Sequence, residues 1–297
     1  MNINIIGVPT YYGSDKKGPE LAPNMLRQNN IKALLSSLLH DVKDEGDVAV
    51  PYVEEKDKLK TGKNLKYHHP LLEVLEETAD RTYNSLKEGS FPLIIGGDHS
   101  VALGSISGIG KYFNDLAVIW IDAHGDINTD LTSPSGNIHG MPLAALMGYG
   151  DESLVNLYSK GKKVPAENVW LVGARDLDQG ELDLISHTNL KVYSSSEVIK
   201  KGPEETAHMI LDMIKDRGIS NIHISFDIDF VDEAFVPGTG TPVKGGPNSE
   251  EAILLVKKLM DSEMVRSMDL VEYNVSEDKD DITLNFIMDF INRVFKM

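Results

Sequence analysis

Three short segments of the sequence concentrate aspartate and histidine, the residue types that bind metal ions well. The segments are GGDHS, DAHGDIN and DIDFVDE, and each directly follows an apolar run. Residues two apart in an extended chain point to the same side, so alternating ligands within a segment can converge. The side chains that the three segments offer to one region are four carboxylates and two imidazoles: His99, Asp122, His124, Asp126, Asp227 and Asp229.

Clustered carboxylates need positive charge nearby, because they otherwise repel one another and raise one another's pKa values. Two divalent cations would balance four carboxylates. A ligand set rich in oxygen with two histidines favours manganese, with iron, cobalt or zinc as alternatives. The chain has no cysteine, which excludes disulfide bonds and zinc–thiolate sites. Two cations about 3.5–4 Å apart can share a water and lower its pKa, so the pattern predicts a site that makes hydroxide near neutral pH.

Each of these residues has a plainer interpretation when it is taken alone. An aspartate at a strand end is typically a turn or helix-capping residue, and a lone histidine such as His99 is typically buried and hydrogen-bonded. The combination of three clusters at three strand ends favours metal binding instead. His68 and His69, in the polar segment KYHHP, are not accompanied by other clusters of ligand-type residues. We interpret them as loop residues that precede a helix.

Other classes of function fit the sequence less well. The glycines of IIGGDHS suggest a phosphate-binding loop, but no Walker lysine follows them. Two-metal phosphoesterases use similar pieces. Here, however, GGDH precedes DAHGD, Asp126 follows His124 too closely, and GNIHG has an extra residue between Asn137 and His139. The phosphoesterase class is a remote alternative, as is a protein that binds metal only for stability.

The clusters need a sheet to bring them together, and the sequence predicts one. Runs of strand length, most of them apolar throughout as in strands covered on both faces, lie at 3–8, 91–95, 116–121, 168–173, 222–226 and 265–271. Helical patterns lie at 69–89, 203–218, 248–262 and 281–297. This alternation predicts an α/β fold with a parallel sheet and helices on both faces, whose ligands bind at the carboxyl ends of the strands. We expect one domain, residues 1–297, with the charged segment 42–66 as a solvated loop.

The composition of the chain argues against nucleic acid and membranes as binding partners. The chain has 46 acidic and 29 basic residues, a net charge of −17, which repels nucleic acid and anionic membranes. No apolar stretch approaches the roughly 20 residues of a membrane span, and the N-terminus lacks the basic region of a signal peptide. Together with the lack of cysteine, which suits a reducing compartment, these features predict a cytoplasmic protein.

The motifs around the clusters resemble those of the ureohydrolase family, in the family's order and over nearly the whole chain. They are IIGVPTYYGSDKKGPELAPNMLR, IIGGDHSVALGSISG, VIWIDAHGDINT, SPSGNIHGMPLAAL, VGARDLDQGE, HISFDIDFVDEAFVPGTGTPVKGG and SMDLVEYN. The resemblance implies a three-layer α/β fold and a homo-trimer or homo-hexamer. It also implies a hydrolase in which a hydroxide bridging two manganese ions attacks a guanidinium or related carbon and releases urea or a similar fragment.

The resemblance assigns roles to particular residues. It implies that the manganese pair is held by His99, Asp122, His124, Asp126, Asp227 and Asp229. Among these, Asp126 and Asp229 are expected to bridge the two ions. His139, in GNIHG, matches the family's proton-shuttling histidine, and Glu272 matches the carboxylate that meets the substrate guanidinium. Asp126 or His139 is expected to deliver a proton to the leaving amine.

The segments SPSGNIHG and RDLDQGE resemble the branch of the family that hydrolyses L-arginine to L-ornithine and urea. Agmatine or another guanidino compound is the alternative substrate. On this basis Asn128, Ser135 and Asn137 are expected to contact the α-carboxylate of the substrate. Asp178 and Glu181 are expected to contact the α-amino group, directly or through water.

Three positions depart from the family pattern. Phe230 stands where many members have glycine, and Glu233 and Val275 each replace a common proline. None of the three is an expected ligand. Phe230 and Glu233 bear on the shape of the loop beside the metals.

Overall fold

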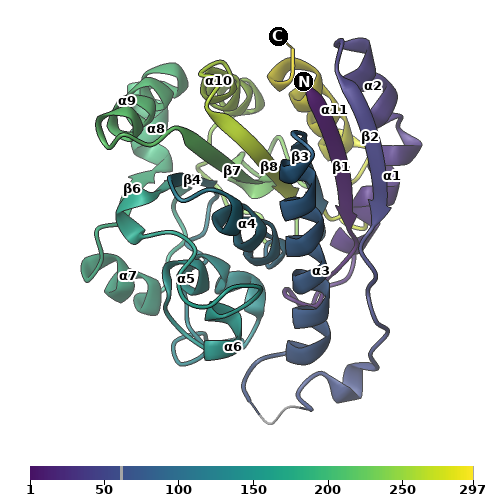
Figure 1. Cartoon of the computed structure of the whole chain (residues 1–297), viewed down its shortest axis with the longest axis vertical. Coiled ribbons are helices and arrows are strands. Elements are labelled where there is room, and N and C mark those ends of the chain that lie inside the picture. The colour runs from purple at the N-terminus through teal and green to yellow at the C-terminus, as the bar shows by residue number, and fades with distance from the viewer. Residues whose placement is uncertain (61–62, 297) are drawn as a thin grey trace.

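The computed structural model describes residues 1–60 and 63–296, and a parallel sheet of eight strands lies at its centre (Figure 1). The strands are β1 (Asn2–Val8), β2 (Asp41–Asp47), β3 (Phe91–Gly96), β4 (Leu116–Ile121), β5 (Val169–Ala174), β6 (Lys191–Ser194), β7 (Asn221–Asp227) and β8 (Val265–Val271). Their order in the sheet is β2-β1-β3-β8-β7-β4-β5-β6. This confirms the predicted α/β fold with a parallel sheet.

Helices connect the strands. The α-helices are α1 (Ala22–Gln28), α2 (Ile31–Ser37), α3 (His68–Lys87), α4 (Val101–Tyr112), α5 (Pro142–Met147), α6 (Glu152–Val155), α7 (Gln179–Ser186), α8 (Ser195–Lys201), α9 (Pro203–Asp216), α10 (Ser249–Met260) and α11 (Ile282–Val294). Short 3-10 helices are η1 (Pro19–Leu21), η2 (Glu55–Asp57), η3 (Ile138–Gly140), η4 (Ala166–Asn168) and η5 (Ile228–Phe230). No helix among residues 1–60 and 63–296 is both long and apolar enough to cross a membrane.

Alternate residues of the central strands face opposite layers of helices. In β4, Ala117, Ile119 and Ile121 pack in one hydrophobic cluster with residues of α1, α2 and α8–α11. Val118 and Trp120 pack in a second cluster with residues of α3, α4 and α5, and α3 and α4 lie in front of the strands in Figure 1. Every residue of β4 is buried, which is why its sequence is apolar throughout.

The predicted strands and helices are confirmed to within a few residues, but several elements were missed. Helix α4 was missed because its sequence, VALGSISGIGKY, is rich in glycine, a poor helix former. The glycines allow close packing on α3: a Cβ atom at Gly108 would lie 2.3 Å from the carbonyl oxygen of Ala79. His68 and His69, expected in a loop, are the first residues of α3, and the His68 Nε2 lies 2.7 Å from the Ser153 Oγ.

The segment 42–66 was expected to be a solvated loop, and this prediction was wrong for its first part. Strand β2 covers residues 41–47 and pairs in parallel with β1 at one edge of the sheet. Only Val42 of β2 is buried. An edge strand keeps its polar side chains in solvent, so no apolar run marks it in the sequence. Residues 61–62 of this segment lie outside the described residues.

Candidate metal centre and active site

Five neighbouring strands end at the same edge of the sheet and carry the candidate residues. In sheet order they are β3, β8, β7, β4 and β5. The residues found at or just beyond their carboxyl ends are, in the same order, His99, Glu272, Asp227, Asp122 and Asp178. Residues up to 173 positions apart in the chain thereby meet at one place, where ligands bind in open parallel sheets.

A first group of ligand atoms surrounds the imidazole of His99. Its Nδ1 lies 2.9 Å from Asp122 Oδ2, 3.0 Å from Asp126 Oδ2 and 3.2 Å from Asp227 Oδ2. This buried nitrogen forms no well-directed hydrogen bond with any of the three oxygens. The Nε2 on the other side of the ring lies 3.0 Å from the Ser225 hydroxyl oxygen. The Nε2 of His99 is thus held by a hydrogen-bond partner, while its Nδ1 faces three carboxylates. This arrangement is typical of a histidine that binds a metal ion.

A second group of ligand atoms surrounds His124. Its Nδ1 lies 3.1 Å from Asp229 Oδ2 and 3.4 Å from Asp122 Oδ1. His99, Asp122 and Asp227 form one set that could hold an ion, and Asp122, His124 and Asp229 form another; within each set the ligand atoms lie within 4.8 Å of one another. The carboxylate shared by the two sets is that of Asp122. This geometry does not favour the expectation that Asp126 and Asp229 bridge the ions.

Asp126 joins the first group through an unusual backbone conformation. Its φ of 53° is in the left-handed region, which is rare for residues other than glycine and clusters at functional sites. The carbonyl oxygen of Asp126 accepts hydrogen bonds from the N–H groups of Leu143 and Ala144, at the start of α5, at 3.0 and 3.4 Å. The N-terminus of α5 thereby holds the strained turn and directs the Asp126 carboxylate toward His99.

The carboxylates of the two groups carry negative charge in a buried place. Burial, together with the charges of Asp229 and Asp122, raises the pKa of Asp227 well above its usual range. Burial and the charge of Asp122 raise the pKa of Asp126 to about 6. For Asp122, burial acts upward, but the two histidines outweigh it and lower the pKa well below its usual range. The four carboxylates therefore fit divalent cations, whose charge would remove the repulsion.

Sequence reasoning missed two side chains that hold the ligands. The Trp120 ring stacks on the His99 ring with centroids 4.0 Å apart, and its Nε1–H donates to Asp122 Oδ2 at 3.0 Å. Thr241 donates its hydroxyl to Asp229 Oδ2 at 3.1 Å. Trp120 was hidden in an apolar strand, and its only signal was its position two residues before a ligand.

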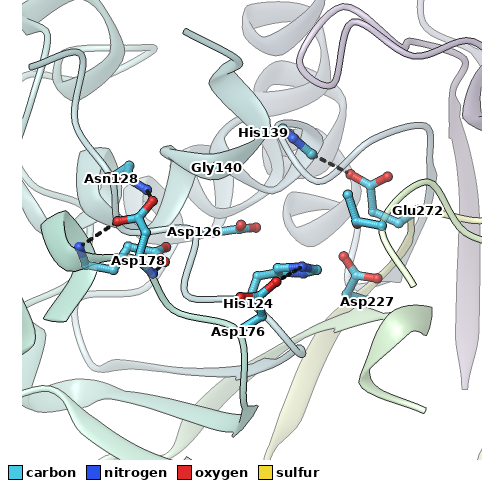
Figure 2. Close-up of a pocket in the computed structure, with 11 residues that line it drawn as sticks. His124, Asp126, Asn128, His139, Gly140, Asp176, Asp178, Asp227 and Glu272 are labelled. Atoms are coloured by element: carbon cyan, nitrogen blue, oxygen red, sulfur yellow. Dashed lines mark hydrogen bonds and ion pairs between the residues drawn. The ribbon is translucent and has the colours of Figure 1, made fainter. Parts of the chain in front are cut away.

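A cavity of about 240 Å³ lies over the ligand groups. The residues that line it are His124, Asp126, Asn128, His139, Gly140, Asp176, Asp178, Glu181, Asp227, Thr241 and Glu272. Figure 2 shows Asn128 and Asp178 on one side, His139 and Glu272 toward the other with Asp227 below Glu272, and Asp126 between the two pairs. The volume suits a small molecule that extends from the ligand groups toward Asp178.

Glu272 occupies a fixed position between the first ligand group and His139. Its backbone φ is 64°, and its side chain is almost fully buried. The Oε1 atom accepts a hydrogen bond from the backbone N–H of His99 at 2.8 Å and lies 3.0 Å from the Nδ1 of His139. The carboxylate is therefore oriented before any substrate arrives.

The far side of the cavity carries two acidic residues at the start of α7. Asp178 and Glu181 form a capping box, in which each side chain accepts from the backbone N–H of the other. Asp178 Oδ2 also accepts from the Asn128 amide at 2.7 Å. Burial raises the pKa of Glu181 to about 7. The capping box explains why these residues stand here, and their position in the cavity wall makes both available to a ligand.

Two expected substrate contacts have other positions. Ser135 and Asn137 lie outside the set of described residues that line the cavity. The Asn137 amide donates to the carbonyl oxygen of Ser14 at 2.8 Å, and the Ser135 hydroxyl accepts from the backbone N–H of Asn137 at 3.2 Å. These contacts stabilise the loop that leads to His139.

Asp98 is fully buried but belongs to neither ligand group. Its carboxylate accepts hydrogen bonds from the backbone N–H groups of Gly13, Ser14 and Ser100 at 2.8, 3.1 and 3.1 Å. The N–H of His139 in turn donates to the carbonyl of Gly13 at 3.1 Å. Asp98 therefore fixes the loop against which the His139 backbone is held.

Phe230, which departs from the family pattern, is fully buried beside the second ligand group. It packs against Phe226, with ring centroids 6.2 Å apart, and against Gly173 of β5. Gly173 has a φ of 103°, and a Cβ atom there would lie 2.3 Å from the Phe230 ring. Because Gly173 has no side chain, the Phe230 ring can pack against it. The larger residue at position 230 is therefore buried in the core.

Comparison with known proteins agrees with this architecture. A family model described as the arginase family matches residues 1–296. The arginase of Brevibacillus brevis is 39% identical over 299 residues, which cover 99% of this chain and 97% of that protein. The crystal structure of the Bacillus cereus arginase has a TM-score of 0.93 and 36% identity, over 100% and 99% of the two chains. The Entamoeba histolytica arginase, solved in complex with L-ornithine, has a TM-score of 0.91 and 30% identity, over 100% and 98%.

A parallel α/β sheet that gathers carboxylates and imidazoles at its carboxyl edge is typical of metal-dependent hydrolases. The matches make the assignment specific. The chain belongs to the arginase family and is a hydrolase of that family.

Proposed function

We propose that this protein hydrolyses L-arginine to L-ornithine and urea at a pair of manganese ions. The observation that carries the proposal is the arrangement of the cavity. Two ligand groups that share Asp122 lie at its floor, and Glu272 at one side and Asp178 with Glu181 at the other line its walls. A cationic guanidinium and a cationic α-ammonium, at the two ends of one substrate, match these acidic groups.

Six residues would hold the metal pair: His99, Asp122, His124, Asp126, Asp227 and Asp229. The oxygen-rich ligand set with two imidazoles favours manganese, and Asp122, whose carboxylate belongs to both sets, would serve both ions. When bound, the cations would neutralise the carboxylates and supply a water whose pKa is lowered to near neutral.

The side chains around the cavity perform the remaining steps. Glu272 accepts hydrogen bonds from the guanidinium and holds its carbon over the floor of the cavity. Water adds to that carbon, the bond from the carbon to the substrate chain nitrogen breaks, and urea forms. Asp126 takes up one proton of the water as its oxygen bonds to the carbon, and Asp126 or His139 delivers a proton to the leaving amine, which becomes the side chain of ornithine. The second proton of the water leaves the new hydroxyl group as the carbonyl of urea forms, and the amine of ornithine, as an ammonium group, carries the positive charge that the guanidinium held.

Arginine is favoured over agmatine by the groups beyond the cavity floor. Arginine carries an α-carboxylate that agmatine lacks, and the Asn128 amide is the donor in the cavity wall that could meet it. The product named for the related Entamoeba histolytica structure, L-ornithine, supports the same choice.

The decisive experiment measures urea release from arginine and from agmatine by the manganese-loaded protein. We expect urea from arginine and far slower release from agmatine. Comparable rates on both would reject the preference for arginine, and no urea from either would reject the proposed reaction.

We further propose, from the family resemblance, that the chain acts as one domain within a cytoplasmic homo-trimer or homo-hexamer. Light scattering coupled to size-exclusion chromatography tests the assembly, and a monomer under assay conditions would reject it. Fractionation of the source cells tests the compartment.

A further inference from the structure

Arg175 follows β5, and its backbone holds one of the two loops that carry the second ligand group. Its N–H donates to the carbonyl oxygen of Ala123 at 2.8 Å, and the N–H of Asp176 donates to the same oxygen at 3.1 Å. Ala123 lies between Asp122 and His124 in the sequence. The chain is therefore fixed at the point from which two ligands of this group extend.

The guanidinium of Arg175 holds the other loop. Its nitrogens donate to the carbonyl oxygens of Asp229 at 2.7 Å, Phe230 at 3.1 Å and Val231 at 3.4 Å. These carbonyls lie at the end of η5, where a helix leaves its last acceptors without an internal partner. Asp229 is the third ligand of the second group, so its backbone position depends on Arg175.

A third segment of the cavity wall is bound by the same side chain. Arg175 donates to the carbonyl oxygen of Val243 at 3.0 Å. Two residues earlier, Thr241 donates to the carboxylate of Asp229 at 3.1 Å. The planar guanidinium has five donors in fixed directions and can serve several segments at once, whereas lysine has three donors on a point charge. Both the main chain and the carboxylate of Asp229 are thereby tied to Arg175.

We propose that Arg175 is a positioning residue that sets the affinity of the second metal ion. None of its hydrogen bonds within the described residues goes to His99, Asp126 or Asp227, the three residues that belong to the first group alone. Loss of the guanidinium should therefore loosen Asp229 relative to Asp122 and leave the first group intact. This inference rests on the proposed two-metal function and names the side chain that orders one of its two sites.

The test titrates manganese into chelator-treated full-length protein by isothermal calorimetry, for the parent, Arg175→Met and Arg175→Lys. Mutation of a residue that positions a metal ligand typically weakens metal affinity by about 10–100-fold. We expect a loss in that range for the second ion and an unchanged dissociation constant for the first. Arg175→Lys should also raise the dissociation constant for the second ion, because lysine keeps the charge but lacks the planar set of donors of the guanidinium. It also carries the test if Arg175→Met does not fold.

The matched control is Arg27→Met. Arg27 is also half-buried and makes several hydrogen bonds, to Asp44 and Asp47 of β2 at the other edge of the sheet. It should lower the melting temperature and leave both dissociation constants unchanged.

Three outcomes separate this inference from the proposed function. Equal weakening of both ions, or parent affinities with a lower melting temperature, would show that Arg175 only stabilises the fold. Parent affinities in a variant that still releases urea would reject this inference alone. A parent protein that binds no manganese would reject the metal-dependent function and this inference together.

Discussion

The Nδ1 atom of His139 lies 3.0 Å from Oε1 of Glu272, so two residues 133 positions apart form one ion pair beside the ligand groups. Burial alone would lower the pKa of His139, but the carboxylate of Glu272 outweighs it and raises the pKa to about 9. For Glu272, burial acts upward and His139 outweighs it, so the pKa is lowered. At neutral pH the pair is charged, and His139 holds a proton within reach of the cavity.

Replacing His139 with alanine should remove that proton without removing the metal ligands. We expect His139→Ala to keep manganese and substrate binding and to lose roughly 10²–10⁴ in turnover number, the usual scale of general acid–base catalysis. Imidazole added to the buffer should restore part of the rate, because it supplies the missing acid. A turnover number equal to that of the parent would show that His139 only positions Glu272.

The same pair predicts a pH dependence of stability in the metal-free protein. The pKa of His139 is higher in the folded chain, about 9, than its ordinary value of about 6.5. Its stabilising contribution is therefore complete below about pH 6.5 and is lost as the pH rises through about 9. Urea unfolding between pH 6 and 10 should show a decline that His139→Asn reduces. The exposed His187 provides the control, because His187→Asn should leave the decline unchanged.

The strands could be predicted from the sequence where both faces of a strand are buried, because burial requires apolar side chains. Strands such as β3 and β4 are buried along their whole length, and their sequences, FPLIIG and LAVIWI, are apolar throughout. The strands that were missed, β2 and β6, lie at the two edges of the sheet. There the backbone pairing, which is independent of side-chain type, is enough to form the strand.

The convergence of the candidate ligands could be predicted from the sequence, but the presence of Asp122 in both candidate groups could not. Spacing shows that Asp122 and Asp126 can point the same way, but the direction of each Asp122 oxygen depends on hydrogen bonds that spacing does not reveal. Trp120 donates to Asp122 Oδ2, and the N–H of His124 donates to Asp122 Oδ1 at 2.7 Å. These contacts turn one oxygen toward each ligand group. Arg175 was missed for a similar reason, because its role depends on carbonyl groups rather than on ligand-type residues.

The shared position of Asp122 predicts a graded loss of metal. Asp122→Asn should lose both manganese ions, whereas Asp229→Asn should lose only the ion of the second group. Elemental analysis of dialysed protein gives the number of ions per chain, with about two expected for the parent. Metal binding stabilises the native state by mass action, so the melting temperature should fall in the same order.

Asp98→Asn is the control for this series, because Asp98 is as fully buried as Asp122 and lies outside both ligand groups. It should keep both ions and lose rate through displacement of the loop that holds His139. If Asp229→Asn loses both ions while Asp122→Asn keeps one, the shared ligand has been assigned to the wrong residue.

The last prediction concerns the substrate end of the cavity. Asp178 accepts a hydrogen bond from the Asn128 amide and offers negative charge to an α-ammonium. A hydrogen bond to a charged group contributes about 1.5–3 kcal/mol. Asp178→Ala should therefore raise the Michaelis constant for arginine about 10-fold or more, with a smaller change in turnover number, because the contact lies far from the reacting carbon. Asp183→Ala, on the exposed side of α7, should change neither constant.

Agmatine completes the test, because it lacks the α-carboxylate and leaves the donors around Asn128 unpaired. The absence of several charged hydrogen bonds at once should lower catalytic efficiency on agmatine by a factor on the order of 10³ relative to arginine. Asn128→Ala should narrow this gap by lowering efficiency on arginine alone, since agmatine has no carboxylate for the amide to meet. If Asn128→Ala lowers efficiency on both substrates equally, Asn128 acts only through Asp178 and is not the group that recognises the carboxylate.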